Sequence, residues 1–167
     1  SDAGTLKRVD YSYLKSANTP FFEAIMSANQ TVSDATDTKV QFNTENFDTN
    51  SAYDHSTNFR FTVPSGEAGK YFIYVVLNNA SDTNSDLLLG YVYLYKNGSA
   101  VRVSHENATS NGGRSFNLNM NLVLDLSVGD YLEVFARTDV SSGTPRFTAE
   151  VGAGKISTFG AYKLIGV

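Results

Sequence analysis

Apolar and polar side chains alternate along residues 115–126, SFNLNMNLVLDL. Successive side chains of a β-strand point to opposite faces of a sheet, so a period of two residues is typical of a half-buried strand. The pattern predicts a strand here, with its leucines facing a core and its asparagines facing solvent. The inward residues are Phe116, Leu118, Met120, Leu122 and Leu124, and the outward ones are Asn117, Asn119 and Asn121.

Further strand patterns recur along the chain and are separated by turn signals. We expect strands at 21–27, 38–43, 58–64, 69–80, 87–101, 115–126, 131–137, 146–151 and 158–167. In 58–64, Phe59, Phe61 and Val63 share one face, and Asn97-Gly98 is a hairpin turn signal within 87–101. No segment has helical periodicity, and no fixed repeat indicates propeller blades. About ten short strands therefore predict an all-β fold, a ten-stranded antiparallel jelly-roll sandwich.

Composition supports this fold class and excludes several kinds of function. Ten Tyr and eleven Phe, with abundant turn-forming residues, favour strands over helices. A net charge of −4 lacks the basic footprint of nucleic-acid binding, and the absence of cysteine excludes disulfides and thiolate sites. No apolar run has the length of a membrane helix, and the first residues do not form a signal peptide. We therefore expect no nucleic-acid partner and no membrane insertion.

Two of the predicted strands are apolar on both faces. In the first, Tyr71, Ile73 and Val75 alternate with Phe72, Tyr74 and Val76. In the second, Leu87, Leu89, Tyr91, Tyr93 and Tyr95 lie opposite Leu88, Val92 and Leu94. One face of each strand can cover the sandwich core, so something else must cover the other face. A monomer would leave that face in water, at about 25 cal/mol per Å² of apolar surface.

No residues in the sequence have the spacing of a catalytic or metal site. His55 and His105, the two histidines, lie in polar, turn-like stretches and are expected on the surface. The segment 82–86, DTNSD, is similar to the start of a calcium loop, but Leu87 and Tyr93 replace the Gly and Glu that such a loop needs. We predict a solvated loop with Asx turns, and we expect no catalytic residue, no cofactor and no metal ligand in this chain.

The order of motifs resembles the jelly roll shared by complement component 1q heads and the tumour necrosis factor superfamily. The residues that carry the resemblance are Phe42, Asp48, Tyr53, Phe61, Gly69 and Tyr71, followed by VLDLSVGDYLEVFAR (123–137) and STFGAYKLIG (157–166). Phe61 comes one residue late, and Ile73 and Val75 stand where the family prefers aromatic residues. The resemblance covers residues 20–167.

The resemblance implies a homotrimer whose inner sheets meet along a threefold axis, used for display or binding and not for catalysis. The strands with two apolar faces fit such an assembly. The candidates for the trimer interface or core are Tyr71, Ile73, Tyr74, Val75, Tyr91, Tyr93, Tyr95, Phe135 and Tyr162. Some relatives bind calcium through carboxylates at the trimer apex, and the sequence assigns no such ligands here.

Residues 1–19 are predicted to form an N-terminal arm before the jelly-roll domain of residues 20–167. The candidates for anchoring this arm to a particle are Lys7, Arg8, Val9, Tyr11 and Tyr13. The last three alternate at strand spacing, so the arm has the character of a segment that adds a strand to a partner's sheet edge. A loose terminus is the alternative.

Two segments, FNTENFDTNSAYD (42–54) and FTVPSGEAGKYF (61–72), are similar to versions of this module in virion proteins of tailed bacteriophages. We therefore interpret the chain as a non-enzymatic trimeric virion protein on the particle surface, bound to other capsid or tail proteins. A whole polypeptide of 167 residues would lack a fibre shaft, which favours capsid decoration. The alternatives are a tail-fibre tip that presents loops 103–114 and 138–146 to a host receptor or glycan, and an extracellular signalling or recognition ligand.

Overall fold

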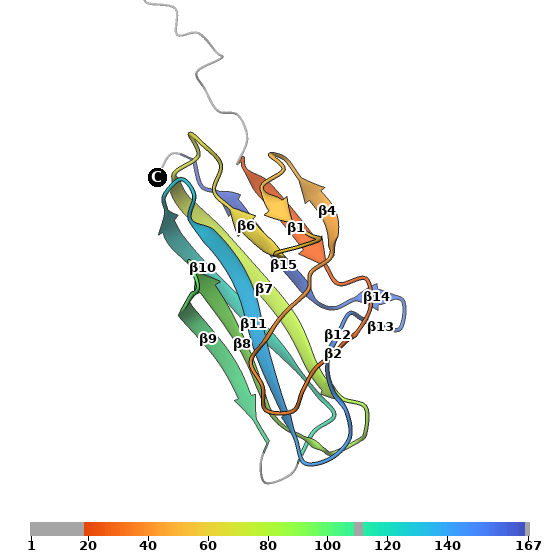
Figure 1. The fold of residues 1–167 in the computed structure, drawn as a ribbon. Coiled ribbons are helices and arrows are strands. Elements are labelled where there is room, and N and C mark those ends of the chain that lie inside the picture. The colour runs from red at the N-terminus through yellow and green to blue at the C-terminus, as the bar shows by residue number, and fades with distance from the viewer. Residues whose placement is uncertain (1–18, 109–111, 166–167) are drawn as a thin grey trace, which may run out of the picture.

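Two antiparallel sheets face each other across a single core in the computed structural model, which describes residues 19–108 and 112–165 (Figure 1). The predicted all-β sandwich is confirmed. Within these residues, no helix is long and apolar enough to cross a membrane.

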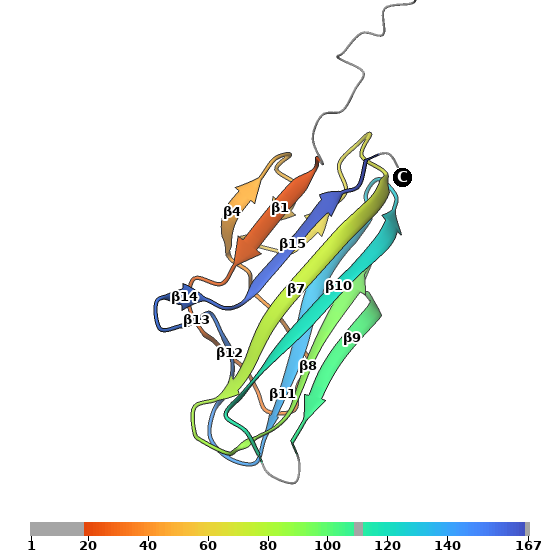
Figure 2. The ribbon, with the colours of Figure 1, turned by 180° about the vertical axis from the view of Figure 1, so that it is seen from behind.

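Seven strands of the described residues form the first sheet, called sheet A. They are β1 (Phe21–Ile25), β2 (Gln30–Thr31), β4 (Thr44–Asp48), β7 (Gly69–Ser81), β10 (Ser115–Leu126), β12 (Pro145–Thr148) and β15 (Thr158–Lys163). β7 is paired along both edges: β10 covers one edge, and β15 and then β12 cover the other. β1 and β4 extend the sheet beyond β15 (Figure 2).

The second sheet, called sheet B, contains six strands of the described residues. They are β3 (Thr38–Lys39), β5 (Tyr53–Asp54), β6 (Arg60–Thr62), β8 (Leu87–Lys96), β9 (Ser99–Asn107) and β11 (Tyr131–Val140). β11 is central, with β8 on one edge and β6 and β3 on the other. A separate hairpin of β13 (Glu150–Val151) and β14 (Gly154–Lys155) projects from the side of the sandwich (Figure 1).

Aromatic side chains from both sheets meet in the core. The Phe22 ring of sheet A stacks on Tyr53 and Phe61 of sheet B, with ring centroids 4.8 and 4.9 Å apart. Such ring pairs contribute about 0.5–1.5 kcal/mol each beyond the burial of their surface. Asn79 on β7 adds a polar link, because its Nδ2 donates to the Arg137 carbonyl oxygen (2.7 Å) and to Thr138 Oγ1 (3.1 Å) of β11.

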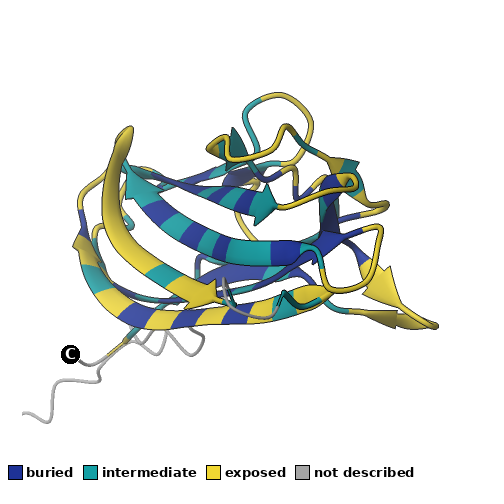
Figure 3. Ribbon diagram, turned by 90° about the horizontal axis from the view of Figure 1, so that it is seen from below, coloured by how far each residue is buried: buried dark blue, intermediate teal, exposed yellow. Residues whose placement is uncertain are grey.

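The predicted faces of 115–126 and the predicted hairpin are confirmed. Leu118, Met120 and Leu122 are buried, Phe116 and Leu124 are half-buried, and Asn117, Asn119 and Asn121 are exposed. Such bands of buried and exposed residues follow the strands in Figure 3. Asn97 and Gly98 both have positive φ, 52° and 78°, as the turn between β8 and β9 requires.

The strand predicted at 38–43 is wrong in its extent. Only Thr38–Lys39 forms a strand, in sheet B, and the next strand begins at Thr44 in sheet A. Val40 and Phe42 are buried, as their alternation suggested. The chain passes from one sheet to the other in this segment, so the strand pairing is interrupted although the side chains still alternate.

Phe59 does not occupy its predicted position. β6 comprises only Arg60–Thr62, and Phe61 and Val63 are buried as expected. Phe59 precedes the strand with φ +48° and is half-buried. A residue in the left-handed region interrupts an extended run, so Phe59 does not continue the face of Phe61.

The number of strands and several strand ends also differ from the prediction. The described residues contain fifteen strands, five of which (β2, β3, β5, β13 and β14) have two residues. β9 continues to Asn107 and β11 to Val140, so 103–107 and 138–140 are paired strands and not loops. Both extensions pair with the start of β8. The segment 146–151 divides between β12 and β13, and the strands predicted at 21–27 and 158–167 end at Ile25 and Lys163.

We expect Leu122→Asp to unfold the subunit. Leu122 is 8% exposed and lies opposite Ile73, so a carboxylate there has no partner and costs about 3 kcal/mol or more. Asn119→Asp, on the exposed face of the same strand, should change stability by no more than about 0.5 kcal/mol. Denaturant melts measure both variants, and equal losses would contradict the assigned faces of β10.

Candidate interaction surfaces

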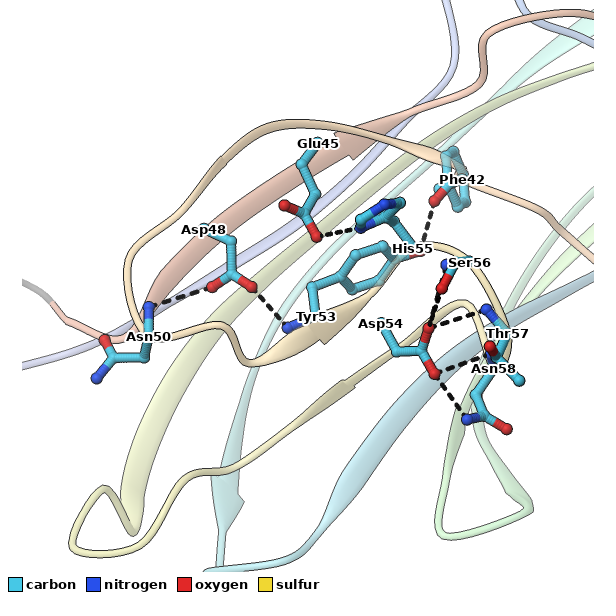
Figure 4. A network of polar contacts seen from close by, with 10 residues as sticks. All are labelled: Phe42, Glu45, Asp48, Asn50, Tyr53, Asp54, His55, Ser56, Thr57 and Asn58. Carbon is cyan, nitrogen blue, oxygen red and sulfur yellow. Dashed lines mark hydrogen bonds and ion pairs between the residues drawn. The ribbon is translucent and has the colours of Figure 1, made fainter.

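The first three residues that carry the resemblance, Phe42, Asp48 and Tyr53, form one hydrogen-bonded unit (Figure 4). Asp48 Oδ2 accepts the backbone N–H of Tyr53 at 2.8 Å, and the Tyr53 hydroxyl donates to the Phe42 carbonyl oxygen at 3.0 Å. Burial raises the pKa of Tyr53 above its ordinary value, and the nearby carboxylates of Asp54 and Glu45 add to the rise. The motif therefore connects β4 to β5 and has a structural role.

Asp54 orders the turn that follows β5. Its Oδ1 accepts the N–H groups of Ser56 (3.1 Å) and Thr57 (2.9 Å). Its Oδ2 accepts the backbone N–H (3.1 Å) and the side-chain amide (2.7 Å) of Asn58. These donors, chiefly Thr57 N–H, hold the pKa of Asp54 well below its usual range. The carboxylate is thus fully engaged within its own turn.

His55 is exposed, as predicted, and its Nδ1 lies 2.6 Å from Glu45 Oε1 on β4. Together with Asp48 and Asp54 these residues line an open cavity of about 290 Å³. Asp48 and Asp54 are bonded to backbone amides, and Glu45 and His55 are bonded to each other. In the described part of the chain, no three His, Asp or Glu side chains are grouped to hold a metal ion. The contacts of these four side chains are therefore those of an ordered loop.

The DTNSD loop is tied to the neighbouring turn at 141–144. Asp82 Oδ1 accepts the Thr144 N–H at 2.7 Å, and Asp86 Oδ1 accepts the Ser141 hydroxyl at 3.0 Å. Thr83 donates its hydroxyl to Asp86 Oδ2. The carboxylates of this loop therefore hold two loops together at one end of the sandwich.

Five aromatic side chains cluster on the outer face of sheet A, and we call them the A-face cluster. Phe47 on β4 contacts Phe21 on β1, with ring centroids 4.1 Å apart. Phe21 and Phe72 flank Tyr162, at 6.1 and 5.3 Å, and Phe72 lies 6.4 Å from Tyr74. Phe47 is 36% exposed and the other four are half-buried. The cluster forms a continuous aromatic surface across four strands.

The Tyr74 ring lies against Gly160 of β15, which is its partner in the sheet register. A Cβ on Gly160 would overlap the Tyr74 ring, so only glycine leaves this space free. The Tyr74 hydroxyl donates to Glu23 Oε2 at 2.8 Å. Burial, and then this hydrogen bond, raise the pKa of Tyr74 above its ordinary value. The ring is thus held in place on three adjacent strands.

The outer face of sheet B carries a second aromatic set, which we call the B-face ladder. The rings of Tyr91 and Tyr93 are parallel (1°) with centroids 5.7 Å apart. His105 stacks on Tyr91 at 5.4 Å, and Tyr95 contacts Phe135 at 4.5 Å. His105 is exposed, as predicted, and the other four residues are half-buried. Sequence reasoning gave no sign of its contact with Tyr91, which follows from the pairing of β8 with β9.

Charged groups border the B-face ladder. The Arg137 guanidinium lies 6.0 Å from the centre of the Tyr91 ring and pairs with Asp139 through Nε and Nη2, at 2.6 and 2.7 Å. This pairing raises the pKa of Arg137. Burial raises the pKa of Tyr93 to about 12, and the carboxylate of Asp37 adds to the rise. The Tyr93 hydroxyl therefore stays neutral at physiological pH.

Glu133 is a buried carboxylate that the sequence did not single out. It is 6% exposed, and Lys39 Nζ lies 2.5 Å from its Oε1. The same ammonium group lies 5.5 Å from the centre of the Phe135 ring. Lys39 therefore compensates a buried charge and covers one end of the B-face ladder.

The nine predicted interface or core residues fall into three groups. Tyr71, Ile73 and Val75 point inward and are at most 1% exposed, so they belong to the core. Tyr74 and Tyr162 lie in the A-face cluster, and Tyr91, Tyr93, Tyr95 and Phe135 lie in the B-face ladder. The anchoring candidates Lys7, Arg8, Val9, Tyr11 and Tyr13 lie outside the described residues. Interface roles stay predictions.

Comparison with solved structures identifies the fold. The Eiger TNF of S. frugiperda matches with a TM-score of 0.57 and 15% identity, over 88% of this chain and 92% of that one. The globular domain of zebrafish complement 1qA protein matches with a TM-score of 0.57 and 14% identity, over 87% and 97% of the two chains. Murine APRIL matches with a TM-score of 0.56 and 12% identity, over 86% and 98%.

By sequence, no family model and no curated protein matches this chain. The structural likeness, at 12–15% identity, shows a jelly-roll fold like that of tumour necrosis factor and complement component 1q. The fold predicted from the motifs is thus confirmed.

We expect Gly160→Ala to destabilise the subunit by about 1–3 kcal/mol, because the added methyl group forces the Tyr74 ring out of its place. In a Tyr74→Ala background the same substitution should cost much less, since the ring is then absent. Thermal melts of the two single variants and the double variant measure the coupling. An equal cost in both backgrounds would contradict this contact between Tyr74 and Gly160.

Proposed function

We propose that this protein is a non-enzymatic structural component of a virion, in which three jelly-roll subunits form a trimer that decorates the capsid of a tailed phage. The observation that carries the proposal is the A-face cluster, an aromatic surface on the outer side of a complete sandwich. The phage assignment rests on the resemblance of 42–54 and 61–72 to virion modules, and the fold is consistent with it.

The A-face cluster supports association of the subunits through sheet A. Its rings lie on β4, β1, β15 and β7, so they occupy a broad face that another subunit can cover. Full burial of one such side chain contributes about 1.5–3 kcal/mol. Val123 on β10, opposite Phe72, adds an apolar residue that is 49% exposed. Three copies related by a threefold axis would bury this surface in a closed assembly.

The B-face ladder favours a second candidate function, a receptor- or glycan-binding tip. The outer faces of sheets A and B point in opposite directions, so a trimer built on the A-face cluster leaves the ladder accessible (Figures 1 and 2). Tyrosine and arginine are the residues most enriched at binding hot spots, and both are present here. Copy number on intact particles separates the two functions: hundreds of copies indicate decoration and a few tens indicate a tail part.

We expect Val123→Asp to convert the trimer into monomers without unfolding it. The side chain is half exposed in the subunit, so a carboxylate is tolerated there but places like charges together at the axis. Val103→Asp on β9 of sheet B, where the side chain is 50% exposed, is the matched control and should stay trimeric. Multi-angle light scattering measures the mass. If only Val103→Asp dissociated, sheet B would form the axis.

Deletion of residues 1–17 tests the capsid attachment. We expect a folded trimer with a melting temperature within about 2 °C of the full chain, since a terminal arm outside a domain contributes little to its stability. Rebinding to particles stripped of the protein should be abolished. Full rebinding of the truncated protein would show that the jelly roll itself makes the attachment. Loss of the trimer would show that the arm is part of the folded core of the subunit.

A further inference from the structure

A second cavity, of about 340 Å³, opens on the outer face of sheet A toward the end of β7. Its walls come from three adjacent strands, because Ser115 of β10 and Arg146 of β12 flank Ala80 of β7, and Thr148 lies beside Asn78 in the next row. Its volume is at the lower end of the range of small-molecule sites, about 300–1,000 Å³. The cavity is formed by one subunit and does not depend on the proposed function.

Two residues that line this cavity each have a buried polar atom without a partner in the protein. Thr148 is 7% exposed, and its buried Oγ1 makes no hydrogen bond. The Nε of Arg146 is also buried without a partner. In the described part of the chain only one other buried side-chain atom, Asn79 Oδ1, shares this property. Buried polar groups are normally hydrogen-bonded, so two exceptions in the same cavity point to a ligand.

The charges and donors of the cavity select the kind of ligand. Arg114 joins Arg146 in the lining, which gives two guanidinium groups. Glu150 is the one carboxylate among the described lining residues, and Lys155 neutralises it, with Nζ 2.8 Å from Oε2. The charged residues that line the cavity therefore leave it positive, and the Asp82 carboxylate lies near enough to Arg146 to interact with it electrostatically. A guanidinium group presents parallel N–H bonds that match the oxygens of carboxylate, phosphate and sulfate.

We propose that this cavity between β7, β10 and β12 binds an oxyanion group, held by the side chains of Arg146 and Thr148. Arg146 donates through its Nε, Thr148 donates through its hydroxyl, and Arg114 adds charge at the edge. The ligand satisfies the two groups that the protein leaves unpaired. This assigns a small-molecule site to the same sheet that carries the A-face cluster, but toward the opposite end of β7.

Thermal melts of the full chain at constant ionic strength test the proposal. Sodium chloride is replaced stepwise by sodium sulfate, phosphate, acetate or glucuronate. At ten times the dissociation constant, the bound anion should raise the melting temperature by about 3–6 °C, and above that concentration the rise should follow the logarithm of the anion concentration. Stabilisation by sulfate, phosphate or acetate indicates a free ion as ligand. Stabilisation by glucuronate alone indicates a carboxylate carried on a sugar.

Matched variants separate binding from a general salt effect. Arg146→Gln should abolish the rise, whereas Arg102→Gln, an exposed arginine on β9 of sheet B with the same change of charge, should keep it. Thr148→Val, nearly isosteric, should weaken binding about tenfold. If Arg146→Gln does not fold, Arg114→Gln is the alternative variant. The proposal would be overturned if an anion stabilised all the variants equally. It would also be overturned if none of the four anions stabilised the wild-type protein. Light scattering on the same samples measures the oligomeric state, so a failure of the proposed trimer is distinguished from a failure of the proposed anion site.

Discussion

β7 is hydrogen-bonded along both edges, and both of its faces contribute side chains to a distinct part of the structure. β10 pairs with it from Gly69 to Ala80, while β15 and β12 share the other edge. Its inner face supplies Tyr71 and Ile73 to the core, and its outer face supplies Phe72 to the A-face cluster and then Asn78 to the cavity. A shift of one residue in register would exchange the two faces. The core, the aromatic surface and the cavity therefore depend on the register of one strand.

Specific contacts fix the two sheets to each other in addition to apolar burial. Phe22 stacks on Tyr53 and Phe61 across the core, and Asn79 donates from β7 to backbone and hydroxyl oxygens of β11. Asn79 fits because residue 90 is glycine, where a Cβ would lie 3.3 Å from the amide nitrogen. Hydrogen bonds to particular acceptors allow one alignment of the sheets, so they set which residues reach each outer face.

The two outer faces offer different surfaces. The A-face cluster consists of aromatic rings with Glu23 as a hydrogen-bond partner, whereas the B-face ladder is bordered by Arg137 and Lys39. The A-face cluster suits contact with an identical subunit, because two copies of this aromatic surface do not place like charges against each other. A ladder with charged borders suits a polar or charged partner. This difference is the reason for the proposal that a trimer axis lies at sheet A and a recognition surface at sheet B.

The sequence by itself determined where the long strands lie and, in 115–126, which way the side chains point. The alternation in 115–126 assigned buried Leu122 and exposed Asn119 correctly, and Asn97-Gly98 marked its hairpin, because both signals depend only on neighbouring residues. Only the tertiary structure decided which strands pair. The pairing ended the strand at Lys39, extended β9 to Asn107, and brought Arg114, Arg146 and Thr148 around one cavity. Arg114 is far from Arg146 and Thr148 in the chain, and no local pattern encodes a contact that forms only when distant segments become neighbours.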